Sequence, residues 1–524
     1  MKQGKLSKRS RSSQPKGHES YILDKWSGNR MQNSSSQPVL VTIPVINNQI
    51  SENYHSKNML AAPAMNLSTQ LAELSMDHKK SDLFHSNDII IGQDGEVLSG
   101  SLEALLKRLT PTRDFSPDSG YIFTVLVNIR TVISPEETMQ RIVQNSMFSM
   151  NSDSCNFSKE HRTRLFAHIL RLCSEWATSI PYDFRSDEMR TRLNELLGMC
   201  SVDQNNKLKA QEIQTNLRNA LNKLDRYEKA VASLHKTLAE SPQIPQQHDA
   251  LVGLAAFCPD PKIIAQQLTH IELERFSMVG VDEIVNSLDT CDISQLGRNK
   301  SSSNTLNTIS FYVEWFNRLS SFSATEVLRQ SKRKNRVQML EFLIDVAREC
   351  CEMGNFNSLM AIVAGLSLPP IARLKRTWNR VDKAKLDILQ HQLDPSGNFL
   401  SYRATMKAAV WRADSARRPE QKIVVPFFVL LLKDLYMMFH NSTRTLPNGH
   451  INFLAYSQVA EQLHKIFLWK RAPCTFTKNP QVLQYLLVSP VYGERESQLV
   501  SFDLEQPENS GERELLKRLR LANK

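Results

Sequence analysis

Residue types that could do chemistry are scattered along this chain instead of being grouped. Its eight cysteines are spread over more than 300 residues, and only Cys350 and Cys351 lie close together. Zinc sites need cysteines separated by at least two residues, so an adjacent pair is not typical of one. The sequence also lacks the Gly-x-x-x-x-Gly-Lys motif with which a loop cradles nucleotide phosphates. We therefore predict no metal and no cofactor.

The most strongly patterned stretch, residues 335–378, indicates binding. Its first half has apolar residues at three- and four-residue steps, which predicts a helix with one buried face. Gly354 is expected to end this helix, and Asn357 or Ser358 to cap a second apolar helix after it. A basic segment, 373–376, follows a Pro-Pro pair. This arrangement is typical of a surface that binds another macromolecule and not of a reaction pocket.

The N-terminal region, residues 1–88, has the composition of a disordered tail. It is rich in Ser, Asn, Gln and Lys, and its first 30 residues hold eight Lys or Arg against two acidic residues. The chain as a whole has a net charge of +11. Such a tail could contact an anionic membrane or nucleic acid, or simply be solvated. Within it, the apolar island 39–46 is either part of the disordered region or a docking strand.

The sequence shows no signal peptide, which favours a reducing compartment. Its longest apolar run, 423–432, is about half the ~20 residues that a membrane span needs. We therefore expect a cytoplasmic protein whose contact with the inner face of the plasma membrane, if any, is peripheral.

The rest of the chain predicts an all-α fold with two helical domains. Apolar stripes between Pro and Gly turn signals predict a helical module at 89–200. One long amphipathic helix, 205–240, lies in a connecting region at 201–248 and is followed by a second helical domain at 249–492 and a tail at 493–524. The repeat of the long helix is too short and irregular to demand a coiled-coil dimer, so we prefer a strut between the domains.

Four blocks of the second domain carry a recognisable pattern. In chain order they are Asp260-Pro261-x-x-x-Ala265-Gln266-Gln267-Leu268-Thr269-x-x-Glu272, Asn355-Phe356-Asn357 followed by Arg373-Leu374-x-x-Thr377-Trp378, Asn398-Phe399-x-x-Tyr402-Arg403, and Val425-Pro426-Phe427-Phe428 followed by Lys433-Asp434-Leu435. Together they resemble the catalytic domain of the Ras guanine-nucleotide exchange factor (RasGEF) family.

The module at 89–200 has a block of its own, residues 100–111 (GSLEALLKRLTP). It resembles the N-terminal module that accompanies the RasGEF catalytic domain. The tract 446–453 and the absence of pleckstrin, Dbl and cyclic-nucleotide regions are similar to the compact subgroup of the family. The resemblance implies a Ras-family small GTPase, of Ras or Rap type, as the partner and no nucleic-acid partner.

The resemblance implies a mechanism without covalent chemistry. A helical hairpin is inserted beside the nucleotide of the GTPase, displaces the switch that covers the nucleotide and disturbs the magnesium and phosphate contacts. Exchange follows because the factor binds the empty GTPase better than the loaded one. Here the hairpin is expected from Pro426 to about His440, with a turn at 441–449 and a return from Ile451 to Trp469, braced by the N-terminal module.

The resemblance also assigns site residues. Phe427, Phe428, Tyr436 and His440 are expected to act from the hairpin, and the two phenylalanines form an aromatic floor for a switch side chain of the GTPase. The residues expected to bind the GTPase are Leu268, Thr269, Glu272, Asn355, Asn357, Arg373, Lys375, Phe399, Tyr402 and Lys433. The alternatives are core packing for the aromatic residues, a solvated face for the basic ones, and a helix cap or a brace of the hairpin for Asn355.

One position departs from the family pattern. Family members usually carry a glutamate near the end of the first hairpin helix, where this chain has His440. A mostly neutral imidazole repels magnesium and phosphate less well than a carboxylate does. The alternative function is therefore a GTPase-binding scaffold that is catalytically weak or inactive, and His440→Glu is expected to raise exchange. A weaker alternative, a membrane or nucleic-acid binder driven by the basic tail, has no recognition module in the sequence.

Overall fold

The computed structural model describes residues 88–152, 159–240, 253–288 and 308–521. Within these ranges almost all regular structure is helical, and one small sheet has three strands. The predicted all-α fold class is therefore confirmed. The basic tail and its apolar island at 39–46 lie outside the described residues.

The N-terminal module is a group of helices that a short β-hairpin precedes in the sequence. Ser101 accepts a hydrogen bond from Ala104 N at 3.2 Å and Asp118 accepts one from Tyr121 N at 2.8 Å, so polar side chains cap the first two helices. The strands have only three and four residues, too few for the alternation that predicts a strand. The elements are β1 (Ile89–Ile91), β2 (Val97–Gly100), α4 (Leu102–Leu109), α5 (Ser119–Asn128), η2 (Ile129–Thr131), α6 (Pro135–Ser152), α7 (Lys159–Ser179), η3 (Pro181–Arg185) and α8 (Asp187–Cys200).

The second domain is centred on closely packed helices. Gly365 lets two of them approach, because a Cβ at this position would clash with the backbone carbonyl of Ser320. Gly354 ends α14 as predicted and has the left-handed φ of +83° that favours glycine. The elements are α10 (Leu254–Phe257), α11 (Pro261–Met278), α12 (Val281–Leu288), α13 (Thr308–Leu328), α14 (Arg333–Met353), α15 (Phe356–Leu366), α16 (Pro369–Ala372), α17 (Lys375–Trp378), α18 (Lys383–Leu393), α19 (Ser396–Ser415) and η5 (Pro419–Lys422).

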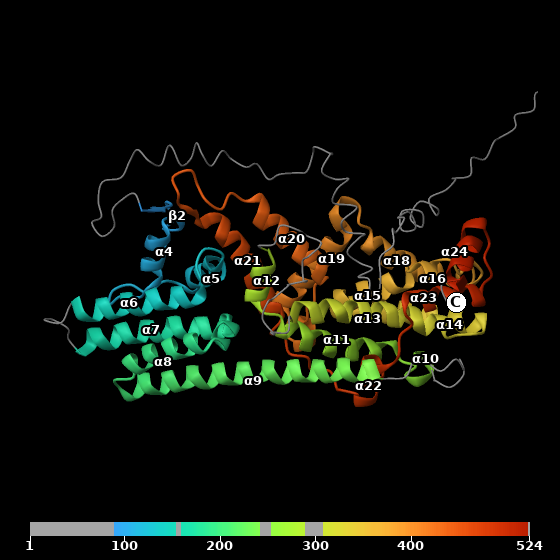
Figure 1. Cartoon of the computed structure of the whole chain (residues 1–524), viewed down its shortest axis with the longest axis horizontal. Coiled ribbons are helices and arrows are strands. Elements are labelled where there is room, and N and C mark those ends of the chain that lie inside the picture. The colour runs from blue at the N-terminus through green and yellow to red at the C-terminus, as the bar shows by residue number, and fades with distance from the viewer. Residues whose placement is uncertain (1–87, 153–158, 241–252, 289–307, 522–524) are drawn as a thin grey trace, which may run out of the picture.

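Helix α9 (Gln204–Glu240) is the long helix that the sequence predicts. It runs along one side of the molecule, from the helices of the N-terminal module to those of the second domain (Figure 1). Its apolar stripe is covered within the chain, since Leu224, Tyr227 and Val231 pack with Met278 at the end of α11. The helix therefore acts as a strut and needs no coiled-coil partner to bury this stripe.

Two helices near the C-terminal end of the domain form the expected hairpin. They are α20 (Phe428–Asn441) and α21 (Phe453–Trp469), and their bounds agree with the predicted segments to within two residues. The connecting loop contains β3 (Ile451–Asn452), which pairs antiparallel with β2 of the N-terminal module. The module and the hairpin thus share one sheet, and Figure 1 shows the loop before α21 reaching β2.

Residues 494–521, which the sequence places in a tail, form helices that pack on the second domain. After α22 (Pro480–Val488) come α23 (Glu494–Leu504) and α24 (Ser510–Leu521). The Glu505 carboxylate accepts hydrogen bonds from Arg376 N at 3.0 Å and from Thr377 N at 2.9 Å. The polar composition of this segment conceals these contacts, because they depend on partners more than 100 residues earlier in the chain.

No helix among the described residues combines the length and the apolar character that a bilayer span requires.

Candidate functional site

The start of the hairpin is joined to the loop between α14 and α15. Asn355 and Val425 form a parallel β-bridge outside the named sheet. Phe356 N donates to Val425 O at 2.9 Å, and Val425 N donates to Gly354 O at 2.9 Å. Two sequence blocks that lie about 70 residues apart therefore meet at the base of α20, and the backbone itself fixes the position of this helix.

Asn355 has the structural role that was one of the two expectations for it. Its Oδ1 accepts a hydrogen bond from Ser358 N at 3.1 Å, so Asn355 is the N-cap of α15. The predicted caps, Asn357 and Ser358, lie inside the first turn instead. Asn355 Nδ2 donates to Thr269 Oγ1 at 3.2 Å and so ties α15 to α11. A buried side chain that satisfies both helices stabilises their packing.

Glu272 is the centre of a buried polar network. Its carboxylate accepts hydrogen bonds from Trp315 Nε1 (3.0 Å), Ser358 Oγ (2.9 Å) and Asn357 Nδ2 (3.1 Å). Burial raises the pKa of Glu272, and these donors oppose the rise. Asn357 Oδ1 also accepts from Phe428 N at 3.2 Å, at the start of α20. The network therefore links α11, α13, α15 and the hairpin through satisfied polar groups.

The two hairpin phenylalanines belong to the core. Phe427 and Phe428 are only 6% and 2% exposed. The ring of Phe427 stacks on Phe316, with 5.6 Å between the ring centroids, and the backbone N of Phe427 donates to Tyr402 Oη at 2.9 Å. Phe399 lies edge-on to Phe427 at 6.4 Å. The aromatic residues expected to form the floor thus lie together, and the partly exposed Phe399 is the one that borders solvent.

A left-handed turn precedes the body of α19. Gly397, Asn398 and Phe399 have φ values of 59°, 57° and 62°. For asparagine and phenylalanine this conformation costs roughly 1–2 kcal/mol each, so neighbouring contacts must hold it. Lys433 Nζ donates to Asn398 Oδ1 at 3.1 Å, and Arg403 Nε donates to Asn398 O at 2.7 Å. The turn is therefore held both by its own helix and by the hairpin.

An ion pair completes the link between α19 and α20. Arg403 Nη1 and Nη2 donate to the two carboxylate oxygens of Asp434 at 2.7 and 2.8 Å. This two-pronged geometry orients both side chains. Neither residue is among the expected site residues, although Arg403 stands inside the third block and Asp434 inside the fourth. Arginine and aspartate commonly form ion pairs, but a sequence alone does not show which arginine pairs with which aspartate.

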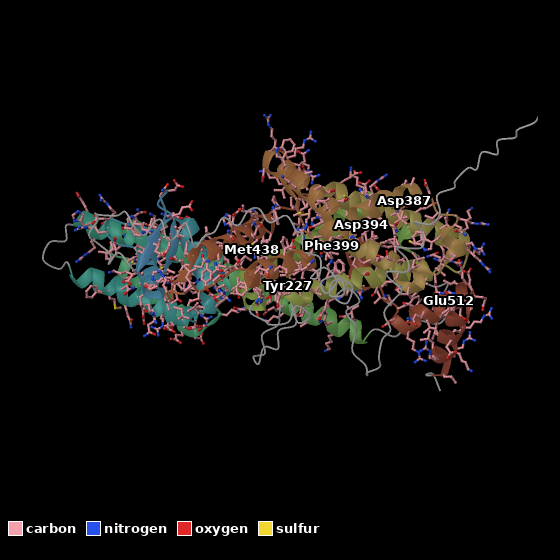
Figure 2. All side chains as sticks on the ribbon, turned by 90° about the horizontal axis from the view of Figure 1, so that it is seen from above. Tyr227, Asp387, Asp394, Phe399, Met438 and Glu512 are labelled. Atoms are coloured by element: carbon pink, nitrogen blue, oxygen red, sulfur yellow. The ribbon has the colours of Figure 1, made fainter. Side chains whose placement is uncertain are left out.

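One face of α20 remains accessible and is called here the hairpin face. It consists of Lys433, Tyr436 and His440, which follow one another at helical spacing. The rings of Tyr436 and His440 lie 4.1 Å apart between centroids. His440 Nε2 lies 2.8 Å from Leu288 O, so this nitrogen donates to the last carbonyl of α12. Met438 and Phe399, labelled in Figure 2, lie on α20 and α19, the two elements that carry this region.

The N-terminal module contacts the hairpin through side chains as well as through the sheet. Asn128 Nδ2 donates to Tyr456 O of α21 at 3.1 Å. The ring of Tyr121 stacks on Phe453 with 5.0 Å between centroids. These contacts lie on α5 and on the first turn of α21, beside the β2–β3 pair. The returning helix is thus held at its N-terminal end.

The structure places six of the ten expected GTPase-binding residues in the interior. Their side chains have protein neighbours and almost no exposed surface, so a direct contact with a partner does not fit this conformation. Their contacts instead assign them to the support of the hairpin and of its neighbouring helices. These residues are Leu268, Thr269, Glu272, Asn355 and Asn357, and Tyr402 is buried in the same way.

Arg373 also differs from its expected role. Its Nη1 donates to Ser501 O at 2.9 Å and to Glu505 O at 2.8 Å, and its Nη2 pairs with Glu512 at 3.1 Å. The guanidinium group is therefore occupied by the C-terminal helices and belongs neither to a solvated face nor to a partner surface. Lys375 is exposed on the neighbouring turn, as the expected basic surface requires.

The described part of the chain shows no cluster of side chains suited to metal or thiol chemistry. No set of three or more His, Cys, Asp or Glu residues there could hold a metal ion. The six described cysteines are free thiols. Burial raises the pKa of Cys350, so its reactive thiolate form is suppressed.

Two family models match this chain. The RasGEF domain model matches residues 263–457, and the RasGEF N-terminal motif matches residues 96–196. The first match contains α20 and the start of α21, and the second contains most of the module that contacts them.

Relatives from several vertebrates are similar over most of their length. Ras-GEF domain-containing family member 1B-A of Danio rerio is 40% identical over 439 residues, which cover 82% of this chain and 84% of the relative. Family member 1B of Homo sapiens is 39% identical over 442 residues, with 82% and 91% covered. Family member 1C of Mus musculus is 37% identical over 429 residues, again with 82% and 91% covered.

Proposed function

This chain belongs to the RasGEF domain family, and from that premise we propose that it is a guanine-nucleotide exchange factor for a Ras-family small GTPase, of Ras or Rap type. The hairpin α20–α21 enters the nucleotide site of the GTPase and promotes release of GDP. The factor does no covalent chemistry, because it acts by binding the empty GTPase better than the loaded one.

The observation that carries this proposal is the fixation of the hairpin at both ends. At its base, Asn355 and Val425 form a backbone bridge, and at its far end β3 pairs with β2. Asn128 adds a side-chain contact to Tyr456. A hairpin that displaces part of another protein must keep its shape against the force of that displacement. These contacts supply such rigidity before the GTPase arrives, so ordering does not consume binding energy.

The hairpin face supplies the groups that meet the nucleotide site. Tyr436 and Met437 are partly exposed and provide steric bulk, whereas Phe439 is buried. Lys433, the third member of this face, is anchored to Asn398. Partly exposed Phe399 and exposed Lys375 remain as direct contacts to the GTPase. The buried residues of the four blocks act indirectly, because they position this face.

A second candidate function is a GTPase-binding scaffold with weak or no exchange activity. The specific observation that favours it is the hydrogen bond from His440 Nε2 to Leu288 O. A histidine held by α12 is less available to disturb magnesium and phosphate than the carboxylate usual in the family. The scaffold would retain the fold and the partner surface but would leave the nucleotide in place.

The proposal also includes the place in the cell where this protein acts. We infer a cytoplasmic location, with peripheral contact between the basic N-terminal tail and the anionic inner face of the plasma membrane. The tail lies outside the described residues, so this inference depends on its composition alone: eight Lys or Arg and two acidic residues among the first 30.

The test is release of a fluorescent guanine nucleotide from a panel of Ras, Rap and Ral GTPases by the full chain. At a micromolar concentration of this protein, we expect nucleotide release from at least one Ras or Rap GTPase to become about tenfold faster or more. Tyr436→Ala should lower this rate with little change in thermal unfolding, because Tyr436 is not part of the buried core. If no GTPase is accelerated but a nucleotide-free member binds, the scaffold is the correct function.

A further inference from the structure

Helix α19 has two faces that are both apolar. One faces the domain, where Tyr402 and Ala409 are buried. The opposite face points outward, and a surface helix normally carries charged or polar residues there. At helical spacing along this outward face the exposed residues are Leu400, Ala404, Lys407, Ala408, Trp411, Asp414 and Ser415. Four of the seven are apolar, and all four lie before Asp414, so α19 presents an exposed apolar stripe from Leu400 to Trp411.

Its two large side chains are among the most exposed hydrophobic residues of the described chain. Leu400 is 68% exposed and Trp411 is 75% exposed. The two residues are 11 positions apart, about 17 Å along a helix of this kind. Trp411 therefore lies well away from Phe399 and the hairpin face, near the opposite end of the helix. A tryptophan that is three quarters exposed at that place needs an explanation other than the packing of its own domain.

The end of α19 near Trp411 is basic. Lys407, Arg417, Arg418 and Lys422 are exposed, and no ion pair joins any of them to another described residue. The nearby acidic side chains are fewer, namely exposed Asp414 and half-buried Glu420, which accepts a hydrogen bond from Thr475. The cationic groups thus flank the tryptophan, and their charge is available to an anionic partner.

This end of the helix projects from the molecule and is attached to α14. Figure 2 shows the orange segment that contains α19 projecting from the body of the molecule, with nitrogen-tipped side chains at its outer end. Arg412 Nη1 donates to Glu352 O at 2.9 Å and so ties the projecting half of the helix to the end of α14. A projection fits a flat or soft surface better than it fits a groove of another protein.

We propose that the outward face of α19, with Trp411 at its centre, is a docking site for an anionic lipid bilayer. The indole ring enters the headgroup region, where amphipathic aromatic rings are favoured. Lys407, Arg417, Arg418 and Lys422 contact the anionic headgroups around it. This site is separate from the basic N-terminal tail, and the two together would give the chain two weak membrane contacts, which bind more strongly than either alone.

The experiment is co-sedimentation of the full chain with vesicles of phosphatidylcholine that contain about 30% phosphatidylserine. We expect Trp411→Ala to weaken partition about fivefold, and Arg417→Glu with Arg418→Glu to weaken it further and to reduce its salt dependence, of which the basic tail would retain a part. Phe148→Ala is the matched control, because Phe148 is an aromatic residue of similar exposure (74%) on α6 of the N-terminal module, outside α19. This control should bind vesicles like the unchanged chain.

Two results would overturn the proposal. The first is equal vesicle binding by the unchanged chain and by Trp411→Ala, which would leave the N-terminal tail as the membrane contact. The second is slower nucleotide release by Trp411→Ala in solution without vesicles, which would identify the GTPase as the occupant of this face. Normal exchange in solution together with weakened vesicle binding supports the bilayer. The vesicle assay uses no GTPase, so failure of the proposed exchange activity would leave its outcome interpretable.

Discussion

Asn128, the last residue of α5, donates its side-chain Nδ2 to the backbone carbonyl of Tyr456 in α21 at 3.1 Å. The same nitrogen donates to Thr124 O at 2.9 Å within its own helix. A buried amide therefore joins the N-terminal module to the returning helix of the hairpin across 328 positions of sequence. The module is in this way part of the machinery that holds the hairpin, besides being a neighbour of it.

Replacement of Asn128 by alanine should loosen this junction. Two buried carbonyl oxygens each lose their side-chain donor and keep the donor of their own helix, so we expect a loss of about 1 kcal/mol in the free energy of unfolding. We also expect slower nucleotide release, because the hairpin becomes less rigid. Urea unfolding and the fluorescent release assay measure the two effects. Asn194→Ala is the control, since Asn194 is an exposed amide acceptor on α8 that contacts only Gln214. Equal exchange rates for the two variants would contradict the bracing role.

Replacement of Arg403 by alanine separates positioning from stability. The Arg403–Asp434 pair is about one third exposed, so its removal should cost less than about 1 kcal/mol. It would nevertheless release Asn398 O and the left-handed turn that holds Phe399 over Phe427. We expect about tenfold slower exchange with almost unchanged thermal unfolding.

The control for this change is Arg348→Ala, which removes exposed ion pairs within α14 that include no residue of the turn. It should leave both exchange and unfolding as they are. An Arg403→Ala variant that retains full exchange would show that the turn keeps its conformation without the ion pair.

The role of His440 is tested by a pair of isosteric substitutions. His440→Gln keeps a donor for Leu288 O and adds no charge, whereas His440→Glu adds the carboxylate usual in the family and loses that donor. If charge limits the hairpin, the glutamate variant should exchange nucleotide about tenfold faster than the glutamine variant. Rates are measured under the same conditions on the GTPase that the unchanged chain prefers. A glutamate variant no faster than the glutamine one would mean that steric bulk, not charge, sets the rate.

The pH dependence of stability should report on Glu283. This carboxylate accepts hydrogen bonds from Thr308 N and Ile309 N at the start of α13. Burial, with a contribution from Asp282, raises the pKa of Glu283 from 4.5 to about 7. The folded state therefore holds the proton more tightly than the unfolded state does. The contribution of Glu283 to the free energy of unfolding should be highest below about pH 4.5. It should fall as the pH rises to about 7, by at most about 3 kcal/mol.

Glu283→Gln should remove this slope and should make the protein more stable than the unchanged chain at pH 8, because the amide keeps an acceptor oxygen without the buried charge. Urea unfolding at half-unit pH steps measures the difference. Glu274→Gln, at an exposed position of α11, is the control and should follow the unchanged chain. Parallel curves for the unchanged chain and Glu283→Gln would exclude Glu283 as the source of the slope.

The C-terminal helices should be part of the folded domain. Glu505 accepts hydrogen bonds from Arg376 N, Thr377 N and Thr377 Oγ1 and lies 3.9 Å from the buried Arg336 guanidinium. Glu505→Gln should lower the free energy of unfolding by about 2 kcal/mol, because an amide cannot accept from all of these donors. Hydrogen exchange should become faster in α23 and α24. Glu508→Gln, at an exposed position, should change neither quantity.

Local patterns along the sequence predicted much of the fold. The long helix α9, the end of α14 at Gly354 and the two hairpin helices follow from helical periodicity and from glycine and proline signals. The strands β1, β2 and β3 do not, since each is too short to carry a pattern and the β2–β3 pair joins segments distant in sequence. The same holds for the left-handed turn at 397–399, whose asparagine and phenylalanine depend on contacts from α20.

The site divides in the same way. The four blocks were enough to identify the family and to locate the hairpin, because those residues are close in sequence and recur as motifs. Whether Asn357 meets a partner or Glu272, and whether Arg373 is solvated or bound by Glu512, depends on what the folded chain brings near. A polar side chain can pair with many others, and burial makes one pairing obligatory. The sequence determined which residues gather around the hairpin, and the tertiary structure decided which of them support it and which can reach a partner.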